Sequence, residues 1–180
     1  NVNITSVANI NANGVINAAK AVDLKADEAI SVAGTIDAGT NANVNAGSAV
    51  TNSGDITAAN AILNAGTNVD FAGNLQASNK ASLLAVANVL INSGTIKAVT
   101  VDVNAREDIT QSSGTINATT ANLSAEENII QSAGSIFATT ANMTSGANIE
   151  QSGGAITATN ANLTAEQAIA QTNGSITAIN

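Results

Sequence analysis

The chain has 180 residues, of which 44% are hydrophobic but only 1% are aromatic and 10% are charged. Any core must therefore be built from small aliphatic side chains, yet β-branched residues are too frequent, and the net charge too modest, for a disordered chain. A net charge of −8 argues against binding to nucleic acid. The absence of cysteine and histidine removes disulfides, thiolate metal sites and the commonest general base, and no apolar run is long enough for membrane insertion.

A glycine recurs almost every twenty residues, and an aliphatic residue follows each glycine two positions later. Self-similarity at a short fixed period is the signature of a solenoid. We predict that these aliphatic residues form one interior ladder along the molecule, the first of three inward columns. They are Ile16, Ile36, Ile56, Leu75, Ile96, Ile116, Ile136, Ile156 and Ile176.

Two further aliphatic columns follow the first in each twenty-residue row, as Leu123 and Ile129 follow Ile116. Small residues lie two positions after the first and second columns, and this spacing is the strand period. Apolar residues at helical spacing do not recur. Each row therefore predicts three short strands joined by polar corners, in which the glycines allow positive φ or close backbone approach. Residues 1–180 are expected to form a single all-β parallel β-helix of nine coils.

The spacing between columns changes along the chain. Three intervals describe each coil: from the first column to the second, from the second to the third, and from the third to the first column of the next coil. These intervals are 8, 6 and 6 residues in the early coils, and 7, 6 and 7 residues from Ile96 onward. The perimeter stays at twenty, which only a closed loop stacked in register requires. We predict an irregular join at about residues 69–83, with one β-bulge at residues 71–73 and another near Lys80.

Acidic residues gather at one corner. They could bind calcium, or they could form a solvated corner that keeps the chain soluble. Paired carboxylates are also used in glycoside hydrolysis, but the chain has no insertion long enough to carry a catalytic loop. We expect no enzyme activity and no catalytic, cofactor or metal site. The acidic residues are Asp27, Glu28, Glu107, Glu126, Glu127 and Glu166.

Three polar files suggest further roles. The glutamines are expected to form an amide ladder, and the threonines resemble part of an ice-binding surface, although Ala158 and Asn160 interrupt the file. Glycosylation sequons also recur; repetition explains their number more simply than glycosylation, which stays an alternative. The residues are Gln111, Gln131, Gln151 and Gln171; Thr119, Thr120, Thr139 and Thr140; and Asn3, Asn117, Asn122, Asn142, Asn162 and Asn173.

Five apolar residues beside the irregular coil allow two interpretations, the first of which is an exposed patch that marks a partner site. Its residues are Phe71, Leu84, Val86, Leu90 and Ile91. The second, which we favour, is that the irregularity turns some of these side chains inward to fill a distorted corner.

The rows GTINATTANLSAEENIIQS (residues 114–132) and GSIFATTANMTSGANIEQS (residues 134–152) resemble the filamentous haemagglutinin repeat of two-partner-secreted exoproteins. The resemblance extends over all 180 residues. It implies a right-handed β-helix, export from a Gram-negative bacterium and a long fibre on the cell surface, used in adhesion, biofilm formation or delivery of a toxic tip.

The leading hypothesis is therefore the structural shaft of a secreted fibre that presents a distal binding or effector domain. Both termini of the sequence look cut from something longer. The partners would be other coils, or a receptor on a host or neighbouring cell reached through domains outside this sequence. The alternative is an extracellular filament or sheath in which copies assemble end to end, and an ice-binding β-helix is a minor one.

Overall fold

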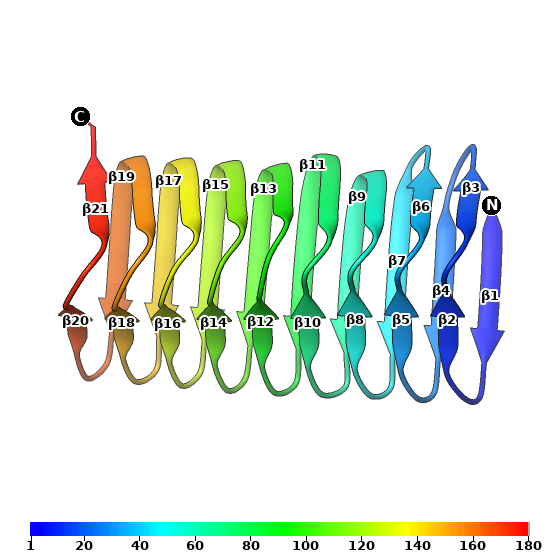
Figure 1. The fold of residues 1–180 in the computed structure, drawn as a ribbon, viewed down its shortest axis with the longest axis horizontal. Coiled ribbons are helices and arrows are strands. Elements are labelled where there is room, and N and C mark those ends of the chain that lie inside the picture. Colours follow the sequence, from blue (N-terminus) through cyan, green and yellow to red (C-terminus); the bar gives the residue numbers. More distant parts are fainter. Residues whose placement is uncertain (180) are drawn as a thin grey trace.

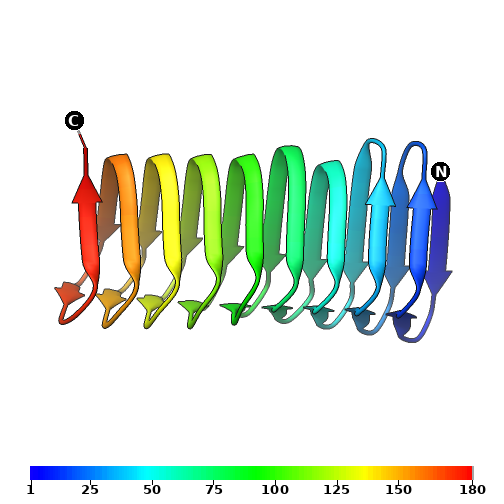
Figure 2. The same ribbon diagram turned by 45° about the horizontal axis from the view of Figure 1, so that its top comes forward.

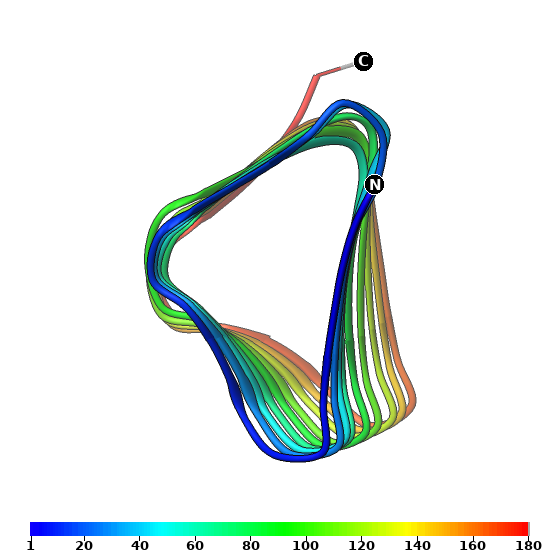
Figure 3. The same ribbon diagram turned by 90° about the vertical axis from the view of Figure 1, so that its right-hand side faces the viewer.

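The computed structural model describes residues 1–179 as a rod of stacked coils, each of which is a three-sided loop (Figures 1 and 3). Viewed from the amino-terminal end, the chain runs clockwise as it recedes (Figure 3). This is the sense of a right-handed helix, and neighbouring strands pair in parallel throughout. The predicted right-handed parallel β-helix of about nine coils is confirmed.

All the regular elements of residues 1–179 are strands. They are β1 (Val2–Ser6), β2 (Ile10–Ala12), β3 (Val15–Ala18), β4 (Val22–Ala26), β5 (Ile30–Val32), β6 (Thr35–Ala38), β7 (Asn41–Ala46), β8 (Val50–Asn52), β9 (Asp55–Ala65), β10 (Val69–Phe71), β11 (Asn74–Ala85), β12 (Val89–Ile91), β13 (Thr95–Ala105), β14 (Ile109–Gln111), β15 (Thr115–Ala125), β16 (Ile129–Gln131), β17 (Ser135–Ser145), β18 (Ile149–Gln151), β19 (Ala155–Ala165), β20 (Ile169–Gln171) and β21 (Ser175–Ala178). None of the described residues forms a helix that could cross a membrane.

Each side of the triangle carries one of the three aliphatic columns. The first face contains β3, β6 and the first part of each long strand, and the second face contains β1, β4, β7 and the remainder of each long strand. These two faces belong to one twelve-stranded sheet. The third face is a nine-stranded sheet of three-residue strands, from β2 to β20.

The three columns form one continuous core inside the rod. In the ladder of the first face, Ile36, Ile96 and Ile136 are fully buried. Successive members of the ladder are register partners on strands of neighbouring coils, as are Ile96 and Ile116, and Ile116 and Ile136. Ile16 and Ile176 are only partly covered because they lie in the end coils and have a neighbouring coil on one side.

The prediction of three short strands in every coil holds only for the first two coils. From Asp55 onward, the strands of the first and second faces merge into continuous strands of 11 or 12 residues. At the corner between the first and second faces, the three residues 38–40 of one coil correspond to only two residues, 58–59, in the next. This follows from the register, in which Asp37 pairs with Thr57 but Asn41 pairs with Asn60. The shorter corner keeps the backbone extended. The narrow loops after β3 and β6 accordingly differ from the smooth bends of later coils (Figure 2).

The join between the two spacing classes begins earlier and ends later than the sequence indicated. Relative to the preceding coil, the chain is one residue shorter at residues 58–59. The lost residue is regained between Ala77 and Lys80, where the register of β11 against β9 shifts. A residue is then gained at residues 92–94, since Phe71 pairs with Ile91 but Asn74 pairs with Thr95. One is lost again between Lys97 and Thr100, because these residues pair with Gln76 and Lys80.

The bulge predicted at residues 71–73 is therefore wrong, because β10 is in register with β8 and β12. The shift near Lys80 lies where it was expected. Through all of these changes the three inward columns stay aligned.

The glycine corner exists in two forms. In the early form two residues, 13–14, separate β2 from β3, whereas in the late form three residues, 112–114, separate β14 from β15. Gly94, Gly114, Gly134, Gly154 and Gly174 all have positive φ, as predicted, but the earlier glycines do not. Early positions such as Gly34 need glycine for close approach instead, because a Cβ atom there would overlap the carbonyl oxygen of Gly14.

Candidate functional site

The predicted aliphatic patch does not form as one surface. Phe71 and Ile91 are fully buried, which corrects their assignment to the patch. Each lies two residues after a buried valine in its strand, and the strand period therefore turns it inward. Leu84 on the second face and Leu90 on the third face are half-buried, whereas Val86 at the corner between them is 48% exposed.

The glutamine file lies inside the rod and forms the predicted amide ladder. The Gln131 Nε2 atom donates to Gln111 Oε1 at 3.0 Å, and Gln151 Nε2 donates to Gln131 Oε1 at 2.8 Å. All three residues are buried. Gln171, in the last coil, is exposed and donates to the carbonyl oxygen of Gly174. The ladder thus pairs the amides of Gln111, Gln131 and Gln151 in the interior, where only Gln151 Oε1 lacks a partner among the described residues, and these buried groups present no ligand-binding surface.

A second amide ladder, not predicted from the sequence, follows the corner between the second and third faces. The side-chain oxygens of Asn68, Asn88, Asp108 and Asn128 each accept the backbone N–H of the residue one coil further on, at 2.9–3.2 Å. These bonds fasten neighbouring coils at a corner where no strand runs. Within residues 1–179, no group of three or more acidic residues is placed to hold a metal ion.

The outward amides of the second face are also paired from coil to coil. Asn122 donates to Asp102 at 2.8 Å, and Asn142 and Asn162 continue the row at 2.8 and 2.9 Å. The sequons at these three asparagines therefore have amide groups that are already engaged. In the threonine file, Thr119 and Thr139 are exposed but Thr120 and Thr140 are half-buried.

A hollow of about 440 Å³ on the second face holds an ion pair between Lys80 Nζ and Asp102 Oδ2 at 2.6 Å. Ile62 and Leu84 supply its apolar walls. Burial raises the pKa of the Asp102 carboxyl, but the hydrogen bonds from Lys80 and Asn122 and the charge of Lys80 outweigh this effect. The pKa of Asp102 consequently lies below its ordinary value. The ion pair gives this hollow no free charge for a ligand.

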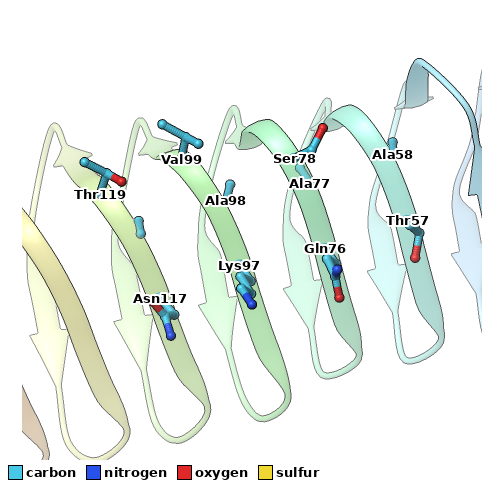
Figure 4. A pocket seen from close by; sticks show the side chains of 11 residues that line it. Thr57, Ala58, Gln76, Ala77, Ser78, Lys97, Ala98, Val99, Asn117 and Thr119 are labelled. Atoms are coloured by element: carbon cyan, nitrogen blue, oxygen red, sulfur yellow. The ribbon is translucent and has the colours of Figure 1, made fainter.

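A second hollow, the first-face groove, has a volume of about 420 Å³ and crosses four coils of the first face (Figure 4). One wall is an outward row in which neighbours are register partners. The opposite rim lies at the corner beside the β11 irregularity, and alanines line the groove between them. The row is Thr57, Gln76, Lys97 and Asn117; the rim is Ser78, Val99 and Thr119; the alanines are Ala58, Ala77, Ala98 and Ala118.

The polar side chains of the first-face groove make no hydrogen bonds within the described part of the chain, in contrast to the second-face amides. The row changes residue type at every coil, from threonine to glutamine, lysine and asparagine, so no amide meets an identical amide. All four side chains are exposed. The groove therefore presents free donors and acceptors together with one unpaired ammonium group.

The exposed Phe137 continues this row, since it is the register partner of Asn117. It is 44% exposed, whereas the only other aromatic residue of the chain, Phe71, is buried. Asn117 and Thr119 were named above only as a sequon and as part of the threonine file, and the groove and Phe137 were not predicted. An available signal was that Phe137 stands between polar residues, Asn117 and Thr157, in an outward column.

Comparison with known families supports the reading of the repeat. The family model described as the haemagglutinin repeat matches residues 1–66, 49–116 and 98–173. The three matches overlap and together extend through nearly the whole rod. No curated protein and no solved structure matches the chain significantly.

Proposed function

This chain belongs to the haemagglutinin-repeat family, and on that basis we propose that it forms part of the shaft of a secreted cell-surface fibre. The family is typical of secreted and cell-surface exoproteins. The shaft would hold a distal binding or effector domain, of an adhesin or a contact-dependent toxin, away from a Gram-negative cell. Its own role is structural rather than catalytic.

The observation that carries this proposal is the continuity of the core. Each coil is hydrogen-bonded to the next on all three faces, and the aliphatic columns pass through the join at β11 without interruption. A repeat that contacts only its neighbours can be extended by adding coils, each of which lengthens the rod by about 4.8 Å. Reach is therefore a direct product of repeat number, as a spacer requires.

Electron microscopy of the complete natural polypeptide tests the proposal. Ten inserted copies of the coil formed by residues 115–134 should lengthen each isolated fibre by about 48 Å at constant width. Ten copies of the same coil with its residue order scrambled serve as the control and should not extend the rod. Fibres of unchanged length would contradict the shaft. A continuous axial repeat across chain junctions would instead favour the end-to-end filament.

A further inference from the structure

We propose that Asn173 is a self-modifying site, at which the side-chain amide is lost spontaneously through attack by the backbone nitrogen of Gly174. The product is aspartate or isoaspartate. This property goes beyond that of a spacer, because the shaft would change chemically with time after folding. It does not rest on the proposed function, so failure of the experiment below would leave the fibre-length experiment unaffected, and the reverse also holds.

The late glycine corner leaves the N–H group of its glycine without an acceptor. The residues on either side of the glycine do bond to the preceding coil: the Ser132 N–H donates to Gln111 O at 3.0 Å, and the Ser135 N–H donates to Gly114 O at 2.9 Å. The extra residue of this corner thus puts one N–H group outside the ladder. Five glycines hold the position, and none of their N–H groups has a partner within the described part of the chain: Gly94, Gly114, Gly134, Gly154 and Gly174.

The early corner engages the same group. The Gly34 N–H donates to Ala12 O at 2.8 Å, and the Gly54 N–H donates to Val32 O at 3.0 Å. A nitrogen whose hydrogen is engaged is a poorer nucleophile, because the hydrogen bond must be broken before the proton can leave. The two forms of the corner therefore differ in whether the glycine nitrogen is free to react.

Asn173 is the one asparagine that directly precedes a late-corner glycine. Serine, alanine or glycine stands before the other four. The Asn173 side chain is exposed, and its amide makes no hydrogen bond with any described residue. Gly174 adds no side chain beside its nitrogen to obstruct the attack. A free amide and a free N–H group are thus adjacent at this corner.

Other asparagines of the chain lack this combination. Asn92, in the first late corner, donates its amide to Asp70 Oδ1 at 2.6 Å. Asn52 is buried, and the N–H of the following Ser53 is bonded to the preceding coil at 2.9 Å. Asn117 lies inside β15, which is paired with a strand on each side. In each of these cases the amide or the following N–H group is held by the fold.

The other Asn-Gly pair, Asn13 and Gly14, lies in an early corner of the first described coil. A glycine N–H in such a corner bonds to the coil before it, as that of Gly34 does, and the structure contains no coil before Gly14. This pair is therefore also open to attack in the 180-residue chain. Gly174 differs, because its preceding coil is present and still leaves its N–H group free. The reactivity of Asn173 belongs to the late corner rather than to the end of the rod.

The reaction proceeds in two balanced steps. The Gly174 nitrogen loses its proton and bonds to Asn173 Cγ, the bond from Cγ to Nδ2 breaks, and ammonia leaves with the proton. The product is a five-membered succinimide ring. Water then opens the ring, either at Cγ to give aspartate or at the main-chain carbonyl carbon to give isoaspartate. The net change exchanges one amide and one water for a carboxylate and ammonium, without oxidation or reduction.

Both products alter the corner in which they form. Each adds a negative charge, and isoaspartate also inserts one carbon atom into the main chain. The coils can move a whole residue between corners while the perimeter is conserved, but one extra carbon cannot be absorbed by such a shift. We therefore expect isoaspartate to weaken the pairing of β21 with β19. The site would link the age of the fibre to the strength of one coil.

Incubation of the 180-residue chain in mildly alkaline buffer, followed by peptide mapping with mass spectrometry, tests the proposal. We expect Asn173 to convert to a mixture of aspartate and isoaspartate, and enzymatic methylation of isoaspartyl carboxyl groups should label the same peptide. Asn92 and Asn117 should stay intact over the same period. Conversion at Asn13 is counted separately. Asn173→Ser should abolish the label on this peptide.

Two added Asn-Gly pairs separate the effect of the corner from that of the chain end. Ser113→Asn adds a pair in an interior late corner, and Ser53→Asn adds one in an interior early corner. Both serines are exposed, and neither hydroxyl is hydrogen-bonded to a described residue. In the folded chains Ser113→Asn should convert about two- to ten-fold faster, which is the factor that one hydrogen bond supplies. In denaturant the two should convert at the same rate.

Two results would overturn the proposal. One is an equal rate of conversion for the folded Ser113→Asn and Ser53→Asn chains. The other is an Asn173 that stays intact in the folded parent chain while it converts in denaturant. The melting temperatures of the two variants, measured before incubation, should match that of the parent chain, so that a difference in rate reports the corner and not unfolding.

Discussion

The first two coils and the coils from Thr95 onward bury the same three columns but close their corners differently. The early coils use three separate strands and a two-residue glycine corner without positive φ. The late coils use one long strand and a three-residue corner with glycine at positive φ. The register of the core is the same in both. The aliphatic columns thus determine the fold, and one residue can move between corners as long as the perimeter is conserved.

The two regions also treat the same inward polar position differently. In the late coils Gln111, Gln131 and Gln151 bond to one another. In the early region Asn52 lies alone in this column, between Val32 and Phe71, and its buried Oδ1 atom has no partner. The ladder also ends on such an atom, since the buried Oε1 of Gln151 has no partner and Gln171 donates to Gly174 instead. A side-chain oxygen in this column is therefore satisfied only where the next coil supplies a donor to it, as Gln131 does for Gln111.

The largest effect is expected at the core that both regions share. Ile136→Asp and Ile36→Asp should each destabilise the rod by more than about 4 kcal/mol, because an unpaired charge would enter an aliphatic column. Asn117→Asp, on an exposed position of the first face, is the control and should be mild. Thermal unfolding followed by circular dichroism measures this. Similar melting temperatures for Ile136→Asp and Asn117→Asp would show that the faces are reversed.

A smaller loss should follow from Gly34→Ala in an early corner. The added Cβ would displace the Gly14 carbonyl oxygen, which accepts the Thr35 N–H at 2.9 Å, at a cost of about 2–3 kcal/mol. Gly14→Ala is the matched control, because a Cβ atom there meets nothing within 4 Å and should cost less than about 0.5 kcal/mol. Denaturant unfolding compares the two. Equal losses would mean that close approach does not explain the early glycines.

The inward polar position should give opposite results in the two regions. Gln131→Leu leaves Gln111 Oε1 without its donor and Gln151 Nε2 without one acceptor, so we expect a loss of about 2 kcal/mol. Asn52→Val removes an unpaired buried oxygen and should be neutral or stabilising by about 1 kcal/mol. Denaturant unfolding of both variants decides the point. A stabilising Gln131→Leu would contradict the role given to the ladder.

The smallest effect concerns pH at the join. Because folding lowers the pKa of Asp102, its contribution to stability is present above the ordinary value of 3.8 and is lost as the pH falls through the lower folded pKa. Lys80 is half-exposed, so we expect at most about 0.5 kcal/mol. Stability measured from pH 2 to pH 5 should fall less with Asp102→Asn than in the parent chain. Asp37→Asn, an exposed carboxylate on the first face, is the comparison; an identical pH profile for parent and Asp102→Asn would refute the assignment.

The columns could be predicted because each inward residue repeats at both the strand period and the coil period. Ile116 and Ile136 meet both conditions, and the structure places them as register partners. The position of the join could not be predicted in the same way. Spacing between columns counts the residues in a corner but does not show where the backbone leaves the ladder, so the change at residues 58–59 was assigned to residues 71–73.

Residues that break their own column were harder to place. Phe71 and Ile91 share an inward column with Gln111, and the glutamine made the column look outward although the strand period indicates the opposite. The first-face groove was even harder to predict from the sequence. Its shape depends on side-chain volumes around the β11 irregularity and on which amides find partners, neither of which a residue pattern records.

The direction of the ladder hydrogen bonds has a consequence for load. They run along the rod while the strands run across it, so a pull on the two ends opens the bonds of one coil before those of the next. Each opened coil of about 20 residues can extend to roughly 70 Å, while the rod loses only about 4.8 Å. Under tension each released coil would therefore span about fourteen times the length that it occupied in the rod. A rod that is rigid at rest becomes an extensible tether that yields coil by coil.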